Sequence, residues 1–145
     1  MGETIHEWTR LVMPWPPTLN NYRVPMPMRV HGGWTARLKT SKEGKAYVPL
    51  AEHAILAQGS PQFMGPIAVR LYFHGKRRGY DMDNFKKCLF DSLKKCGVIE
   101  DDKYIWRDES FIRHPHTRVG AVVLDIRKLT EAEIAEADTF EIDFG

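Results

Sequence analysis

The chain has 145 residues, of which 43% are hydrophobic and 28% are charged. These fractions are typical of one globular domain and exclude collagen-like, fibrous and disordered proteins. No strictly apolar run exceeds four residues, as at Ala121 to Leu124, so we expect no membrane span, no signal peptide and a cytoplasmic protein.

Charge is distributed unevenly along the chain. Residues 1–128 hold all 21 Lys and Arg with 13 Asp and Glu, whereas residues 129–145 hold six acidic residues and no basic residue. A basic body favours contact with nucleic acid, although an ordinary solvated surface explains the same charge. We expect a single domain over residues 1–128, followed by an acidic helix and tail over residues 129–145.

The N-terminal part begins with a short strand and then becomes rich in proline. Residues 7–12 predict a strand that ends at the Pro-rich segment 13–17, because proline cannot donate to a β-ladder. Residues 23–39 combine prolines and glycines with basic side chains, so we expect a mobile basic loop there. Trp34 is the aromatic side chain of this loop that we consider for contact with DNA.

The middle of the chain predicts a helix followed by a strand. Thr40 and Glu43 form a capping-box pattern before apolar residues at helical spacing. Pro49 lies inside this pattern and should kink the helix or make it restart. Residues 67–74 alternate with a period of two, which predicts a half-buried strand.

The clearest helix begins near Asp83, because apolar residues from Phe85 to Cys96 share one face and Gly97 is a suitable C-terminal cap. Three strands and a capped helix are predicted after it, at 104–107, 110–113, 119–126 and from Thr130 with Glu133. Helices and strands mix without a regular βαβ repeat. The predicted fold class is therefore α+β, with a small mixed β-sheet packed with helices.

Three carboxylates lie close to the two ends of this helix. Asp81 and Asp83 have i, i+2 spacing, which puts both side chains on one face of an extended segment, and the chain returns toward them at Asp102. Clustered carboxylates repel one another unless a cation lies between them, and Mg²⁺ takes oxygen ligands that it shares with phosphate. Lys87 adds a cation one helical turn after Asp83. This set is suited to metal-assisted phosphodiester hydrolysis.

The same residues also have a purely structural explanation. An Asp-x-Asp pair before a helix often caps the helix and complements its dipole. Acidic runs such as Glu100 to Asp102 are usually solvated loops, and Lys87 can pair with Asp83 or Asp91 at i, i+4 spacing. The spacing alone leaves both explanations open.

Three short motifs occur in order along the chain: Met13 to Pro17 with Asn20, Asn21 and Tyr22; Asp81 to Asn84 with Lys87; and Gly97 to Asp102. Each motif alone is weak, but their combination and order resemble the RusA family of Holliday-junction resolvases. These are small endonucleases of bacteria, mostly from prophages and phages. With the strand from Ile67, the resemblance covers most of residues 7–126.

The resemblance implies a structure-specific endodeoxyribonuclease that depends on Mg²⁺, with Mn²⁺ able to substitute and no organic cofactor. Asp81, Asp83 and Asp102 match the metal-binding catalytic aspartates of the family. Lys87 matches its catalytic lysine. The family fold is a small α/β domain paired as a homodimer, which resolves a four-way (Holliday) junction by paired symmetric nicks. A junction-binding protein that does not cut, and a nuclease acting on flaps or other branched DNA, are the alternatives.

Further residues receive roles from this interpretation. Asn84 is expected to hold the metal-binding carboxylates in place. Six basic residues are candidates for phosphate contacts, each of them equally explained as part of a solvated face: Lys76, Arg77, Arg78, Lys86, Lys94 and Lys95. Family members often carry a basic residue before the first aspartate, whereas this chain has Tyr80, which would stack on DNA or hydrogen-bond to it.

Overall fold

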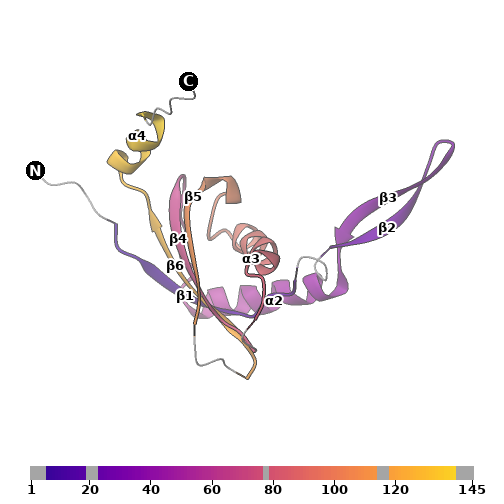
Figure 1. Cartoon of the computed structure of the whole chain (residues 1–145), viewed down its shortest axis with the longest axis horizontal. Coiled ribbons are helices and arrows are strands. Elements are labelled where there is room, and N and C mark those ends of the chain that lie inside the picture. Colours follow the sequence, from indigo (N-terminus) through magenta and orange to yellow (C-terminus); the bar gives the residue numbers. More distant parts are fainter. Residues whose placement is uncertain (1–5, 19–22, 77–78, 114–117, 140–145) are drawn as a thin grey trace, which may run out of the picture.

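A computed structural model describes residues 6–18, 23–76, 79–113 and 118–139, without the side chains of 23–25 and 35–40. It consists of a four-stranded sheet with helices packed on it, a separate two-stranded ribbon and a terminal helix (Figure 1). No helix in the described part of the chain is both long and apolar enough to cross a bilayer.

The main sheet mixes antiparallel and parallel pairing. Its strands follow the order β1 (Thr9–Pro14), β6 (Ala121–Lys128), β4 (Ile67–His74) and β5 (Ile105–Ile112). Strand β6 is antiparallel to both of its neighbours, whereas β4 and β5 are parallel. Helix α3 (Asp83–Lys95) connects β4 to β5, as a parallel pair requires. The predicted α+β fold with a mixed sheet is confirmed.

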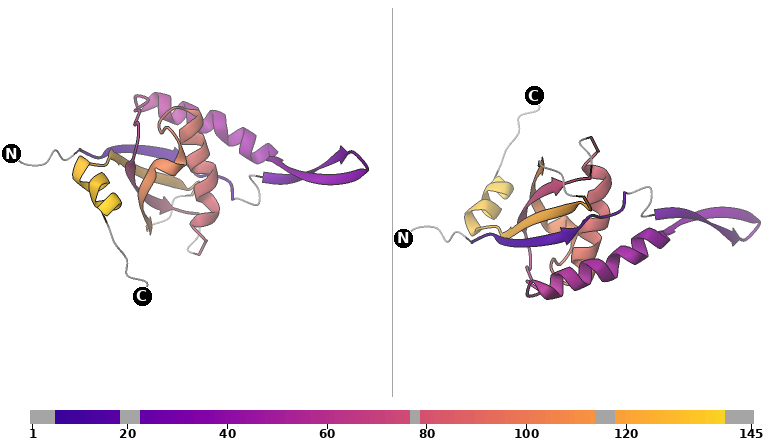
Figure 2. Two further views of the ribbon diagram at one scale, coloured as in Figure 1. Left: turned by 90° about the horizontal axis from the view of Figure 1, so that it is seen from above. Right: turned by 90° about the horizontal axis from the view of Figure 1, so that it is seen from below.

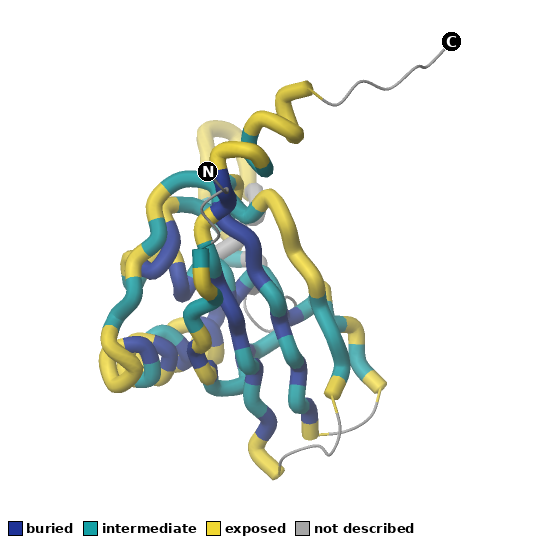
Figure 3. Tube along the Cα trace, turned by 90° about the vertical axis from the view of Figure 1, so that its left-hand side faces the viewer, coloured by how far each residue is buried: buried dark blue, intermediate teal, exposed yellow. Residues whose placement is uncertain are grey.

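One face of the sheet carries the hydrophobic core. Along β4, the side chains of Ile67, Val69, Leu71 and Phe73 are almost fully buried. They pack with side chains of α3 and of α2 (Lys42–Ala57), so both helices lie on this face (Figure 2). Figure 3 shows buried and partly exposed residues alternating along the strands, as expected for a sheet covered mainly on one side.

Helix α2 is one continuous helix, as its apolar spacing predicts, but its first residues differ from prediction. Its N-cap is Ser41 rather than Thr40, with the Gly44 amide donating to Ser41 Oγ at 3.0 Å. The helix continues through Pro49, so of the two outcomes predicted there the restart is wrong and the kink stays a prediction. Pro49 lies on the exposed face, where water can hydrogen-bond the carbonyl that loses its amide partner.

The predicted loop over residues 23–39 is wrong, because this segment is an antiparallel hairpin of β2 (Arg23–Val30) and β3 (Gly33–Thr40). Its turn is only two residues long, with Gly32 at φ +86°. Counting back from the closing pair Val30–Gly33, both prolines fall at positions that do not hydrogen-bond to the partner strand. They therefore cost the hairpin no ladder hydrogen bond.

The C-terminal third differs from prediction in one strand. The two strands expected at 104–107 and 110–113 form the single edge strand β5, whose polar residues 107–109 face solvent and hide its continuity in the sequence. Strand β6 and helix α4 (Glu131–Thr139) are confirmed. Thr130 and Glu133 form the predicted capping box, with Glu133 N donating to Thr130 Oγ1 and Thr130 N to Glu133 Oε1. The division of the chain at residue 128 stays a prediction.

Candidate active site

Aromatic side chains support the segment that joins β4 to α3. Trp15 packs against Tyr80 and Phe85, with ring centroids 5.1 Å and 4.8 Å away. The Tyr80 hydroxyl donates to the carbonyl of Phe73 at 2.9 Å, and partial burial raises the pKa of this hydroxyl. Tyr80 therefore anchors the chain immediately before Asp81, and its hydroxyl is already used within the protein.

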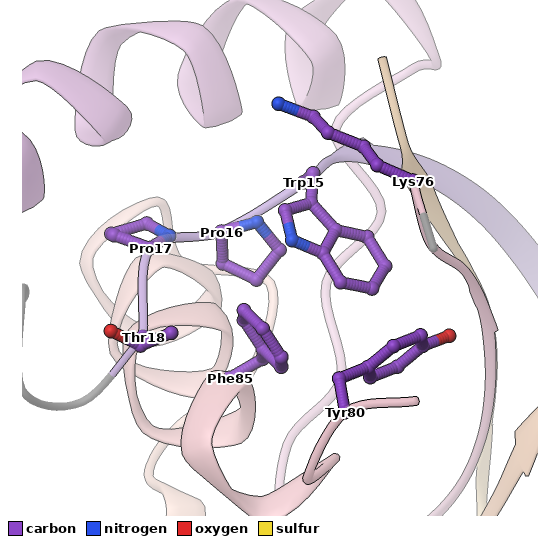
Figure 4. Close-up of a pocket in the computed structure, with 7 residues that line it drawn as sticks. All are labelled: Trp15, Pro16, Pro17, Thr18, Lys76, Tyr80 and Phe85. Atoms are coloured by element: carbon purple, nitrogen blue, oxygen red, sulfur yellow. The ribbon is translucent and has the colours of Figure 1, made fainter. Parts of the chain in front are cut away.

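A hollow of about 420 Å³ opens beside this cluster (Figure 4). Its walls are aromatic rings and prolines, with one cation and the side chain of one threonine: Trp15, Pro16, Pro17, Thr18, Lys76, Tyr80 and Phe85. The first motif of the sequence and the segment before the second motif thus meet in space. Residues 19–22, which hold the asparagines of the first motif, lie outside the described residues.

Asp81 and Asp83 lie at the start of α3. The backbone amide of Asp83 donates to Asp81 Oδ1 at 3.0 Å, whereas the N-cap residue of the helix is Met82, which makes no side-chain cap. Both residues are exposed, and the Asp83 side chain retains 84% of its accessible surface. This hydrogen bond occupies only one oxygen of Asp81, so it leaves carboxylate oxygens at the helix start for a cation.

Two lysines of α3 each lie between two carboxylates. Lys87 Nζ is 3.0 Å from Asp91 Oδ1 and 3.7 Å from Asp102 Oδ2, which belongs to the short 3₁₀-helix η1 (Asp102–Tyr104). This contact joins the second and third motifs of the sequence. The i, i+4 ion pair between Lys87 and Asp91, which the purely structural explanation of Lys87 predicts, is present as well.

Lys86, rather than Lys87, contacts Asp83. Its Nζ lies 3.4 Å from Asp83 Oδ1 and 3.0 Å from Asp108 Oδ2 on β5. No pattern in the sequence predicts a role at the site for Asp108. The i, i+3 spacing of Asp83 and Lys86 was visible in the sequence, but the approach of Asp108 depends on where β5 pairs in the sheet.

The residue before Asp102 is held in a separate network. Asp101 accepts from the Lys103 amide and from Lys94 Nζ, the latter at 3.1 Å. Hydrogen bonding with Asp102, followed by that with Lys94, lowers the pKa of Asp101 well below its usual range. Lys94, a candidate for phosphate contact, is thus already paired with an acidic residue.

The remaining candidates differ in how available they are. Lys76 and Lys95 are exposed and make no ion pair with described residues, whereas Arg77 and Arg78 lie outside the described residues. The backbone amide of Asn84 donates to the backbone carbonyl of Asp81 at 3.2 Å. Among the described contacts, the Asn84 side chain makes no hydrogen bond to a carboxylate, so its expected supporting role stays a prediction.

The carboxylates of Asp81, Asp83 and Asp102, together called the acidic edge, suit a hard divalent cation in their chemistry. Asp81, Asp83 and Asp102 offer only carboxylate oxygens at or near the surface. Across the residues that the structure describes, no three His, Cys, Asp or Glu side chains converge closely enough to hold a metal ion. Mg²⁺ commonly takes only one or two carboxylates and fills its other positions with water and phosphate oxygens. The chemistry of these carboxylates fits Mg²⁺, and the assignment of Asp81, Asp83 and Asp102 as its ligands stays a prediction.

Comparisons with known proteins show which family the chain belongs to. The family model described as Endodeoxyribonuclease RusA matches residues 14–120, which include the acidic edge. The chain is 32% identical over 124 residues to the crossover junction endodeoxyribonuclease RusA of Escherichia coli K12 and to that of Shigella sonnei. A relative from Enterobacteria phage 82 is 32% identical over 123 residues. Each match covers 82% of this chain and 93% of the relative. The chain therefore belongs to the RusA family of endodeoxyribonucleases.

Proposed function

We propose that this protein is a Mg²⁺-dependent endodeoxyribonuclease that resolves four-way DNA junctions. The observation that carries this proposal is the 3.7 Å approach of Lys87 to Asp102, because it unites two acidic motifs that are distant in the sequence. Its relatives are named crossover junction endodeoxyribonucleases, which supports branched DNA as the substrate.

The carboxylates at the start of α3 would hold the metal. Asp81 and Asp83 would bind Mg²⁺ together with Asp102, and Mn²⁺ would substitute for it. When bound, the ion supplies Lewis-acid chemistry to the scissile phosphate. The exposure of Asp83 fits this role, because the ion that it would bind must reach a phosphate group of DNA.

Lys87 would stabilise the charge that develops on the scissile phosphate during attack. Its ammonium is held between Asp91 and Asp102, which restricts the side chain to the acidic edge before DNA arrives. Because charge accumulates on phosphate only in the transition state, a cation placed in this way favours cutting over binding.

Other basic residues would position the DNA without reading its sequence. Lys76 and Lys95 are the strongest candidates among the described residues, because neither is engaged by a described carboxylate. Lys86 and Lys94 would first have to leave their carboxylate partners. Arg77 and Arg78 stay candidates on their charge alone.

A homodimer is part of the proposal. Each chain holds one copy of Asp81, Asp83 and Asp102, whereas resolution of a junction needs two nicks on opposed strands. A two-fold interface supplies the second site with the matching symmetry.

The test is cleavage of an end-labelled synthetic four-way junction by the full chain in Mg²⁺, Mn²⁺ or EDTA. A linear duplex and a flap of matching sequence serve as controls. We expect metal-dependent nicks on two opposed strands of the junction and little cutting of the duplex. Binding without cutting in any metal would favour a junction-binding protein. Faster cutting of the flap would favour the alternative nuclease.

A further inference from the structure

The β2–β3 hairpin, residues 23–40, projects from the body of the protein and is called the arm below (Figures 1 and 2). Its main contacts are between its own two strands, and it extends beyond the N-terminal end of α2. A two-stranded ribbon is marginally stable by itself in water. The arm is therefore expected to gain stability from a binding partner.

The charge of the arm indicates the kind of partner. Residues 23–40 contain four Lys and Arg, one His and no Asp or Glu. The acid-free stretch is longer still, because no carboxylate occurs between Glu7 and Glu43. A segment of this length with only positive charge complements a polyanion, and nucleic acid is the polyanion on which this family acts.

One of the two free edges of the arm, that of β2, argues against a protein strand as the partner. Pro25 and Pro27 occupy outward-facing positions of β2, so two of the amides that would pair with an added strand are absent. Addition of a strand from a second copy of the chain is therefore disfavoured at this edge.

The tip of the arm carries side chains suited to DNA. Trp34 retains 73% of its accessible surface, and Arg29, its register partner on β2, is exposed as well. Residues paired in this way project from the same face of a hairpin. An indole next to a guanidinium can contact bases through its ring and phosphates through its charge.

The dimensions also fit. Strands of this length span about 25 Å at roughly 3.3 Å per residue, and a two-stranded β-ribbon fits the major groove, which is about 12 Å wide. We infer that the arm lies in a groove of one duplex arm of the DNA substrate, with Arg29 and Trp34 in contact with it. This inference rests on the proposed function, because it takes branched DNA as the substrate.

A trimmed arm tests the inference. Deleting residues 27–30 and 33–36 leaves the two-residue turn between Met26 and Arg37, which are paired in the native register. Affinity for the junction is measured by fluorescence anisotropy in EDTA, so that binding is separated from cutting. We expect the trimmed chain to bind at least tenfold more weakly, and Trp34→Ala about tenfold more weakly. Arg29→Ala should reduce the salt slope by about one.

Matched controls remove similar groups from the body. Trp106→Ala deletes a partly exposed indole on β5, and Lys45→Ala deletes an exposed cation on α2. Both should bind the junction within twofold of wild type. Affinity of the trimmed chain within twofold of wild type would overturn the inference. So would a trimmed chain that is monomeric where wild type is dimeric, because the arm would then hold a second copy.

A second measurement uses the unaltered chain, in case the trimmed chain does not fold. Photo-cross-linking to a junction that carries 5-iodouracil should yield a DNA-linked peptide containing Arg29 or Trp34. Cross-links confined to the body would overturn the inference. Failure of the proposed function looks different, because wild type would then bind the junction without cutting it in Mg²⁺.

Discussion

The acidic edge around Asp81 and Asp83 rests on packed aromatic side chains, whereas the arm is supported mainly by its own two strands. Trp15, Tyr80 and Phe85 tie the start of α3 to the core, so the carboxylates have a defined position relative to the sheet. Catalytic groups need such support, because small displacements from the productive geometry lower the reaction rate. A ribbon with few contacts to the core can adjust its position to DNA instead.

This comparison predicts a separation of effects. Changes at the acidic edge should alter cutting more than binding, and changes in the arm should alter binding more than cutting by bound enzyme.

The largest effect is expected from Asp83→Asn. Loss of the charge weakens metal binding and also relieves repulsion of phosphate, so cutting should fall by at least about 10³ while junction binding is kept or strengthened. Single-turnover cleavage and anisotropy measure the two quantities. Glu43→Gln is the control, because Glu43 is also acidic and in the first turn of a helix. Undiminished cutting by the Asn variant in Mg²⁺ would remove Asp83 from the site.

Lys87→Ala should slow cutting by about 10²-fold and leave binding nearly unchanged, since its cation acts on charge that develops during attack. If Lys87 only pairs with Asp91 on the helix surface, the loss is about 0.3–0.5 kcal/mol of stability and cutting stays within a few-fold of wild type. Lys45→Ala, which removes an exposed cation from α2, is the control. Single-turnover cleavage at saturating protein distinguishes the two outcomes.

Gly75→Ala tests the aromatic support directly. A Cβ at Gly75 would collide with the Tyr80 ring, so the ring and the segment before Asp81 must move. Such overpacking costs about 1–3 kcal/mol of folding free energy, and we expect slower cutting by enzyme that remains folded. Gly79→Ala is the matched control, because nothing lies within 4 Å of a Cβ there. Thermal unfolding and cleavage rates that are equal in the two variants would show that Tyr80 does not position Asp81.

The two regions also differ in how far the sequence predicts them. Helix α3 and strand β4 follow from local periodicity, and the capping box of Thr130 and Glu133 is confirmed in its hydrogen bonds. The sequence of the hairpin predicts a loop, because prolines at alternate positions are typical of interrupted strands. Only the register shows that the backbone nitrogens of both prolines point away from the partner strand.

Within the acidic edge, the sequence does not predict which lysine contacts which carboxylate. The spacing of Asp83 and Lys87 puts them on one helix face, but Lys86 makes the contact with Asp83, and Lys87 reaches Asp102. Asp108 joins this network through the parallel pairing of β4 and β5. Pairing between distant strands is a tertiary property that no local pattern contains.

The smallest expected effect separates the body from the arm by pH. Glu133 receives hydrogen bonds from Arg127 at 2.6 Å and 2.9 Å, and these lower its pKa from the ordinary 4.5 to about 2. A carboxylate with a lowered folded pKa stabilises the protein above the unfolded pKa, and this stability is lost as pH falls through the folded value. We expect a loss of about 1 kcal/mol between pH 4.5 and pH 2, because the pair is near the surface and partly screened.

The arm holds no carboxylate, so it should show no direct titration over this interval. NMR amide shifts followed from pH 5 to pH 2 should therefore change at the start of α4 and stay nearly constant at the tip of the arm. Glu133→Gln isolates the cause, because this variant cannot titrate and should lose the corresponding part of the pH dependence of thermal unfolding. Equal pH dependence in Glu133→Gln and wild type would show that this pair does not hold α4 to the body. Titration of the arm tip together with α4 would show that the arm is coupled to the body, against the independence inferred from its contacts.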